Sequence, residues 1–87
     1  TLIWFMNSQL EKRIKNVMSA VFEFSANEIT DDSSPDTIRS WDSLKHMNLV
    51  SSLEEEFDCL FSDSEILEMM NFPLIKLIIS EKISSLL

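Results

Sequence analysis

The chain has 87 residues, which is the size of a single domain and too small to enclose two separate cores. Apolar residues make up 45% of it, enough for a packed core, but they form no run long enough to span a bilayer. The absence of glycine excludes the Rossmann, P-loop and α/β-hydrolase motifs, which all require one. A formal net charge of −8 repels polyphosphate and argues against nucleic-acid binding. We expect a small soluble domain.

Cysteine usage and the amino-terminal sequence bear on location and domain limits. The single cysteine, Cys59, cannot form an internal disulfide, which suits a reducing, cytoplasmic location. The first six residues are apolar but lack a basic flank and are too short for a signal peptide. Because Met6 resembles a native start, we interpret residues 1–7 as an N-terminal extension and residues 8–87 as the domain.

The first helix is expected to begin at Ser8 and to end near residues 22–24. Ser8 and Glu11 have the spacing of a capping box, in which each side chain binds the other residue's backbone amide. Apolar residues then recur at intervals of three and four, as one buried helical face requires. These residues are Leu10, Ile14, Val17, Met18 and Val21.

Residues 25–42 are expected to form a long loop. The polar run at residues 31–34 and the following Pro35 favour turns over regular structure. Within this loop, Ile29 and Ile38 are the apolar residues available to anchor it to the core. Loops of this length in small domains usually have a function or contain an element that the sequence pattern has missed.

A second helix is predicted from about Ser43 to Asp58, with Asp42 as its N-cap. At about 100° per residue, its apolar residues divide into an inner arc and two outward positions. Leu44 and Met47 are predicted to face outward among acidic residues, either as isolated exposed side chains or as a small docking patch. The inner arc contains His46, Leu49, Val50, Leu53 and Phe57.

Two further helices complete an all-α, four-helix prediction. Ser62 and Glu65 repeat the capping-box spacing and begin a short third helix. Asn71 caps a fourth, in which Pro73 occupies the first turn, where its missing amide costs little. The apolar residues assigned to the third helix are Ile66, Leu67, Met69 and Met70.

Charge is concentrated on the second helix and the segment that follows it. Residues 42–68 contain one basic and eight acidic residues. Such a cluster usually forms a solvated surface, but it also steers basic partners toward the protein. Both interpretations stay open at this point.

Arrangements for catalysis or metal binding are weak. Ser43 and His46 are neighbours on a helix, but an esterase would also need a glycine elbow and an oxyanion hole, and the inward direction of His46 suits a packed histidine. His46 and Cys59 lack the further ligands that zinc requires. The acidic run at residues 54–56 has no sign of a cleft for paired-carboxylate chemistry. We therefore expect no enzymatic activity.

The motif Trp41-Asp42-Ser43-Leu44, followed by Leu-Glu-Glu-Glu-Phe-Asp at residues 53–58, resembles the acyl carrier protein family over residues 8–83. The resemblance implies a four-helix bundle with a long first loop and a short third helix. It also implies that Ser43 receives 4′-phosphopantetheine from coenzyme A through a separate magnesium-dependent transferase. The thiol of that arm then carries acyl groups as thioesters.

Further expectations follow from the same resemblance. Asp42 and Leu44 match the residues that flank the modified serine, and Leu44, Met47, Glu54 and Glu55 match the family's partner-binding surface. The implied partners are a phosphopantetheinyl transferase, an acyl- or aminoacyl-loading ligase, and acyltransferase or synthase enzymes with basic docking patches. The carrier would be a monomer without nucleic-acid partners or a membrane span. Residues expected to line an acyl-binding interior are His46, Val50, Phe61, Ile66 and Met69.

Three residues depart from the fatty-acid carriers. Trp41 replaces a small residue, Lys45 is basic where an acid is frequent, and Asn48 lacks an acidic group. These departures argue against a role in fatty-acid synthesis and favour a specialised pathway or an aminoacyl cargo, which the sequence does not separate. The alternative function is a helical interaction adaptor with an acidic docking face and no prosthetic group.

Overall fold

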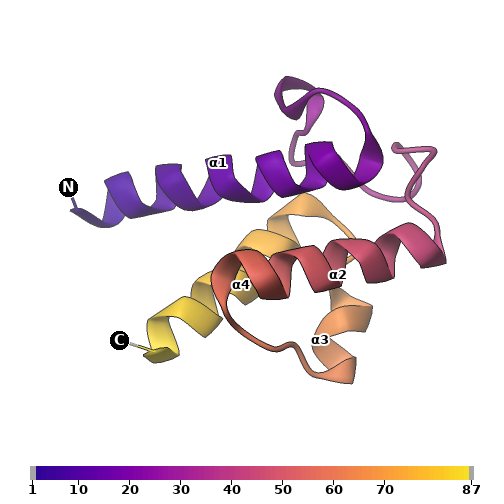
Figure 1. The fold of residues 1–87 in the computed structure, drawn as a ribbon. Coiled ribbons are helices and arrows are strands. Elements are labelled where there is room, and N and C mark those ends of the chain that lie inside the picture. The colour runs from indigo at the N-terminus through magenta and orange to yellow at the C-terminus, as the bar shows by residue number, and fades with distance from the viewer. Residues whose placement is uncertain (1, 87) are drawn as a thin grey trace.

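Four α-helices and one short 3-10 helix make up the regular structure of the computed structural model, which describes residues 2–86 and the side chains of residues 8–83 (Figure 1). Helix α1 lies along one side of the molecule and α3 on the other, with α2 and α4 between them. The all-α prediction is therefore confirmed for the described residues. The elements are α1 (Leu2–Phe22), η1 (Ala26–Glu28), α2 (Ser43–Phe57), α3 (Asp63–Glu68) and α4 (Phe72–Leu86).

The first helix begins earlier than predicted. It starts at Leu2, and Ser8 is an exposed residue inside it, so the predicted start at Ser8 is wrong. Residues 2–7 contain no glycine or proline, and the helix therefore continues through them, supplying the hydrogen bonds that a cap would otherwise supply. The backbone crosses the proposed boundary at residue 8 without a break. The assignment of residues 1–7 as an extension stays a prediction, because their side chains lie outside the described residues.

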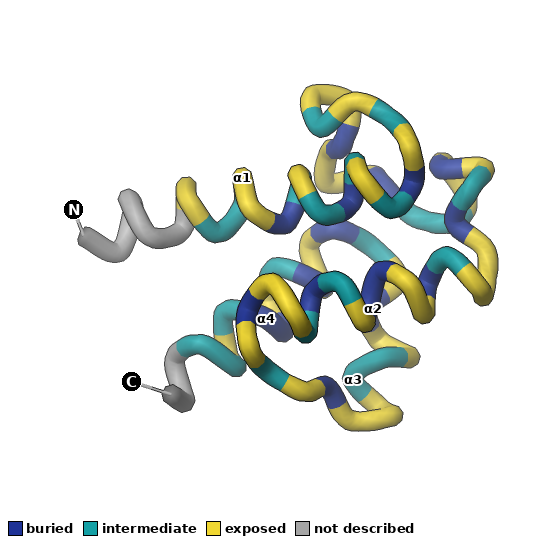
Figure 2. Tube along the Cα trace, viewed as in Figure 1, coloured by how far each residue is buried: buried dark blue, intermediate teal, exposed yellow. Residues whose placement is uncertain are grey.

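The hydrophobic core lies where α1, α2 and α4 meet, and buried residues recur at intervals along each of them (Figure 2). The predicted inner arc of α2 is confirmed, since all five of its residues are buried. Burial of these side chains is the main stabilising contribution to such a fold. The most deeply buried side chains are Ile14, Met18, Ile29, Leu49, Leu53, Met69, Phe72, Ile75 and Ile79.

The long loop between α1 and α2 is anchored as predicted. Ile29 and Ile38 are both buried. Ser33 is also buried: its hydroxyl accepts a hydrogen bond from the Thr30 amide at 2.9 Å, and its carbonyl accepts one from the Phe72 amide at 3.2 Å. These contacts fix the loop against the start of α4. The sequence did not predict the short helix η1 inside the loop.

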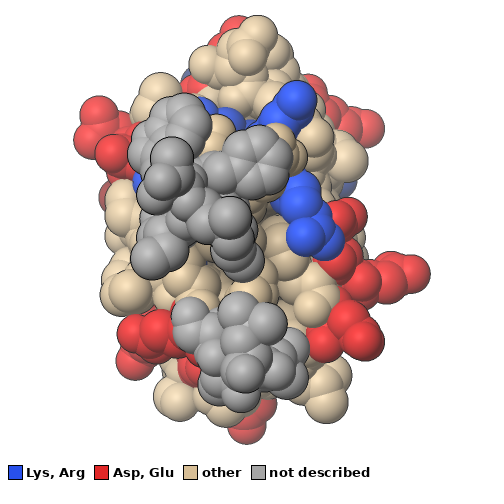
Figure 3. Space-filling view, turned by 90° about the vertical axis from the view of Figure 1, so that its left-hand side faces the viewer, with Lys and Arg blue, Asp and Glu red and all other residues tan. Residues whose placement is uncertain are grey.

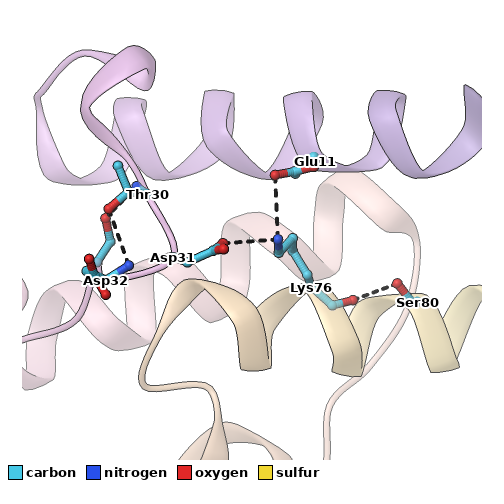
Figure 4. Close-up of polar contacts among 7 residues, drawn as sticks. Glu11, Thr30, Asp31, Asp32, Lys76 and Ser80 are labelled. Carbon is cyan, nitrogen blue, oxygen red and sulfur yellow. Dashed lines mark hydrogen bonds and ion pairs between the residues drawn. The ribbon is translucent and has the colours of Figure 1, made fainter. Parts of the chain in front are cut away.

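Lys76 connects three parts of the fold (Figure 4). Its Nζ lies 3.2 Å from Asp31 Oδ1 in the loop and 3.5 Å from Glu11 Oε1 on α1. The same nitrogen lies 4.6 Å from the centre of the Phe72 ring, at a distance typical of a cation–π contact. Ion pairs this close to the surface each contribute little to the free energy of unfolding. Together, however, they join the loop to α1 and α4.

The predicted caps of α3 and α4 are present. Ser62 and Glu65 form the full capping box at α3, and Asn71 Oδ1 accepts a hydrogen bond from the Leu74 amide at 2.9 Å. Helix α3 ends at Glu68, however, so Met69 and Met70 lie beyond it and not within it as expected. No helix among residues 2–86 combines the length and the hydropathy needed to cross a membrane.

Candidate functional site

The candidate site is the start of α2. Asp42 has an extended backbone, and its Oδ1 accepts a hydrogen bond from the Lys45 amide at 2.8 Å, so it is the N-cap that the sequence predicted. Ser43 is the next residue, the first of the helix, and it is exposed. The first amides of a helix have no partner within the helix and carry partial positive charge. The Ser43 hydroxyl therefore lies at the solvent-facing, positive end of α2.

Trp41 holds the backbone just before this helix. It is only 4% exposed, its ring centre lies 4.9 Å from that of Phe22, and its Nε1 donates a hydrogen bond to His46 Nδ1 at 3.1 Å. Sequence analysis did not place Trp41 in the core. The signal was nevertheless there: Trp41 and His46 occupy the two positions of a hydrophobic staple on either side of the cap.

His46 uses both of its ring nitrogens. An indole N–H can only donate, so His46 Nδ1 accepts from Trp41 and the ring proton resides on Nε2. That Nε2–H donates to the carbonyl oxygen of Ile66 on α3, at 2.8 Å. Since both nitrogens are engaged elsewhere, His46 is not placed to act as a base for Ser43. The geometry thus agrees with the interpretation of His46 as a packed, hydrogen-bonded residue.

An exposed stripe runs along α2 away from Ser43. We define the α2 stripe as Leu44, Met47, Ser51 and Glu55, which are spaced by three and four residues, together with Asp58, the C-cap just after the helix; all five are exposed. Leu44 is 71% exposed and Met47 49%, so the outward direction predicted for both is confirmed. The stripe is apolar beside Ser43 and acidic at its far end.

The three consecutive glutamates of α2 have different surroundings. Glu54 is half-buried, and its Oε2 accepts a hydrogen bond from the Phe61 amide at 3.0 Å, in the segment between α2 and α3. Glu56 Oε2 lies 2.8 Å from Nη2 of Arg13 on α1. Glu55 is exposed. Of the two glutamates predicted to bind partners, Glu55 therefore faces solvent, whereas Glu54 also has a structural contact.

An open groove of about 710 Å³ lies beside the acidic end of the stripe, lined in part by Cys59 and Leu60. Leu60 is 78% exposed.

Burial raises the pKa of the Cys59 thiol, and nearby carboxylates add to that effect while the charge of Lys82 opposes it. Across the described residues, no group of three or more His, Cys, Asp or Glu side chains is placed to hold a metal ion.

Acidic residues outnumber basic ones in this protein, 15 to 7. In the view of Figure 3, which faces the side where the chain begins and ends, acidic side chains lie around the rim and the few basic ones gather in its upper part. A negative surface of this kind attracts partners with basic patches and repels other anions.

The residues expected to line an acyl-binding interior are packed into the core. Val50, Phe61 and Met69 are buried, Ile66 is half-buried, and His46 is only 8% exposed. No protein-family model matches the chain. Its function therefore has to be inferred from the residues of the site.

Proposed function

We propose that the chain is a carrier protein of the acyl-carrier type, in which Ser43 bears a 4′-phosphopantetheine arm. The observation that carries the proposal is the position of Ser43, exposed as the first residue of α2 and directly after the Asp42 cap. A serine in this position is accessible to the active site of another protein. The four helices, the long first loop and the short α3 also agree with the acyl-carrier fold that forms part of the proposal.

The residues at the start of α2 fit such an arm. On modification, Ser43 Oγ forms a bond to the phosphorus of coenzyme A that bears the pantetheine. The pyrophosphate P–O bond breaks, 3′,5′-ADP leaves, and the hydroxyl proton passes to a base of the transferase. The new phosphodiester is an anion at a helix N-terminus, where unpaired amides and the helix dipole favour negative charge. The arm supplies a thiol that holds acyl or aminoacyl groups as thioesters.

The α2 stripe is the surface we propose for partner enzymes. Leu44 and Met47 offer apolar contacts next to the modified serine, while Glu55 and Asp58 offer negative charge farther along the helix. Charge complementarity with a basic patch raises the rate of encounter, and a small apolar contact keeps the complex short-lived. A carrier that visits several enzymes needs this combination of fast association and fast release.

Intact-mass measurement tests the proposal. Incubation with a broad-specificity phosphopantetheinyl transferase and coenzyme A should add the mass of one arm, and Ser43→Ala should abolish the gain. The matched control is Ser64→Ala, because Ser64 is likewise exposed, follows an aspartate and lies in the first turn of a helix. This variant should be modified like the wild type.

Two results would count against a carrier modified at Ser43. An unchanged mass, in a reaction that modifies a known carrier, would leave the acidic-adaptor alternative, because an adaptor needs the α2 stripe but no arm. A mass gain that persists in Ser43→Ala would place the modification on another residue.

A further inference from the structure

Helix α3 has few side-chain contacts with the core. None of its residues 63–68, all of them described, is fully buried; Ile66 packs against the core while partly exposed, and Leu67 is 77% exposed. The nearest core residues are Phe61 before it and Met69 after it, both buried. Helix α3 is therefore held mainly by Phe61 and Met69 at its two ends, and the polar contacts between them add to its attachment.

Two polar contacts hold α3 against the rest of the protein. On one side, the carbonyl oxygen of Ile66 accepts the hydrogen bond from His46 Nε2 at 2.8 Å. On the other, Glu65 Oε1 lies 2.8 Å from Lys82 Nζ on α4. The His46 contact is the one that joins α3 to α2, the helix that begins at Ser43.

The His46 contact is part of a longer arrangement of buried rings at the start of α2. The rings of Trp41 and His46 are stacked, with their centres 6.1 Å apart, and the Trp41 ring in turn contacts Phe22. We call the hydrogen bonds from Trp41 to His46 and from His46 to Ile66 the indole–imidazole chain. It runs from the residue before the cap, through the first turn of α2, to α3.

We propose that the indole–imidazole chain keeps the carried acyl group outside the helical bundle, so that the group stays accessible to solvent on its arm. The inference rests on the proposed function. An alkyl chain entering between α2 and α3 has to separate His46 from Ile66, which leaves an imidazole N–H and a carbonyl oxygen without partners in apolar surroundings. That loss opposes the free energy that the alkyl chain would gain by burial.

The test compares a short and a long thioester on the same protein. The transferase loads Ser43 from acetyl-CoA or octanoyl-CoA, and intact mass confirms each product. Hydroxylamine then cleaves the thioesters. The ratio of the octanoyl to the acetyl cleavage rate is divided by the same ratio for the free acyl-pantetheines, which gives the normalised ratio. A cargo that spends about two thirds of its time inside the bundle is cleaved about threefold more slowly.

Three variants make the test specific. The normalised ratio should be close to one for the wild type and should fall about threefold for His46→Ala, which removes the contact and opens space. His46→Gln should behave like the wild type, because an amide can accept from Trp41 and donate to Ile66. Circular dichroism checks helicity, and Trp41→Phe is the substitute if His46→Ala does not fold, with the ratio expected to fall in the same direction.

The outcomes are distinguishable. Slow octanoyl cleavage in the wild type would overturn the inference, since the chain would then enter despite His46. A ratio that stays at one in His46→Ala, or in Trp41→Phe where that substitute is used, would also overturn it. In both cases loading succeeds, so the proposed function would survive. Failure to load any arm would overturn the proposed function and this inference together.

Discussion

Replacing Asp42 by alanine tests whether the cap that positions Ser43 is also a source of stability. In the structure, Asp42 Oδ1 accepts the Lys45 amide at 2.8 Å, so the substitution leaves that amide to solvent. Loss of an N-cap side chain costs about 0.5–2 kcal/mol, and the aspartate charge at the positive end of the helix adds about 0.3–1 kcal/mol. Because Asp42 is exposed, we take the lower part of the charge range and expect Asp42→Ala to lower the free energy of unfolding by about 1–2 kcal/mol.

The companion variant separates the hydrogen bond from the charge. Asp42→Asn keeps an acceptor oxygen at the cap and should lose about 0.5 kcal/mol or less. Asp36→Ala controls for removing one negative charge at an exposed loop position of this acidic protein. Urea unfolding followed by far-ultraviolet circular dichroism at pH 7 measures all three.

Two patterns would refute this reasoning. If Asp42→Ala unfolds within about 0.3 kcal/mol of the wild type, the cap does not stabilise α2. If Asp42→Asn is as unstable as Asp42→Ala, the charge and not the hydrogen bond is responsible. In that case 0.5 M salt should reduce the difference in unfolding free energy between the wild type and both variants.

Two further predictions concern the segment around α3. The hydrogen bond from Lys82 holds the pKa of Glu65 below its ordinary value, so this carboxylate stabilises the fold above the unfolded-state pKa of about 4.3 and loses that effect as the pH falls through its folded value. Urea midpoints should therefore show Glu65→Gln less stable than the wild type at neutral pH and equal to it in acid; a gap that widens in acid would contradict the assignment. Burial raises the pKa of Cys59, so iodoacetamide should alkylate it more slowly at pH 8 than a cysteine in an unstructured peptide, and equally fast alkylation would refute this.

The sequence by itself determined the helices that begin with a local capping signal. The caps at Asp42, Ser62 and Asn71 lie where the sequence predicted them, because each depends on residues only two or three positions away. The same kind of signal failed at Ser8, where the residues before it were also able to form a helix. A capping box shows where a helix can begin, but it does not require the preceding residues to leave the helix.

At the candidate site, too, some features follow from the local sequence and others depend on tertiary packing. The exposure of Ser43 at the start of α2 follows from its neighbour Asp42 and from the helical period alone. The sequence contains a staple signal for Trp41, but only the tertiary structure shows that His46 donates to Ile66, twenty positions away. It also decides that Lys76 lies between Glu11 and Asp31, which are 65 and 45 positions away in the sequence. Local patterns report hydrogen bonds within a turn or two of helix, whereas these contacts depend on how the helices pack, which no short stretch of sequence encodes.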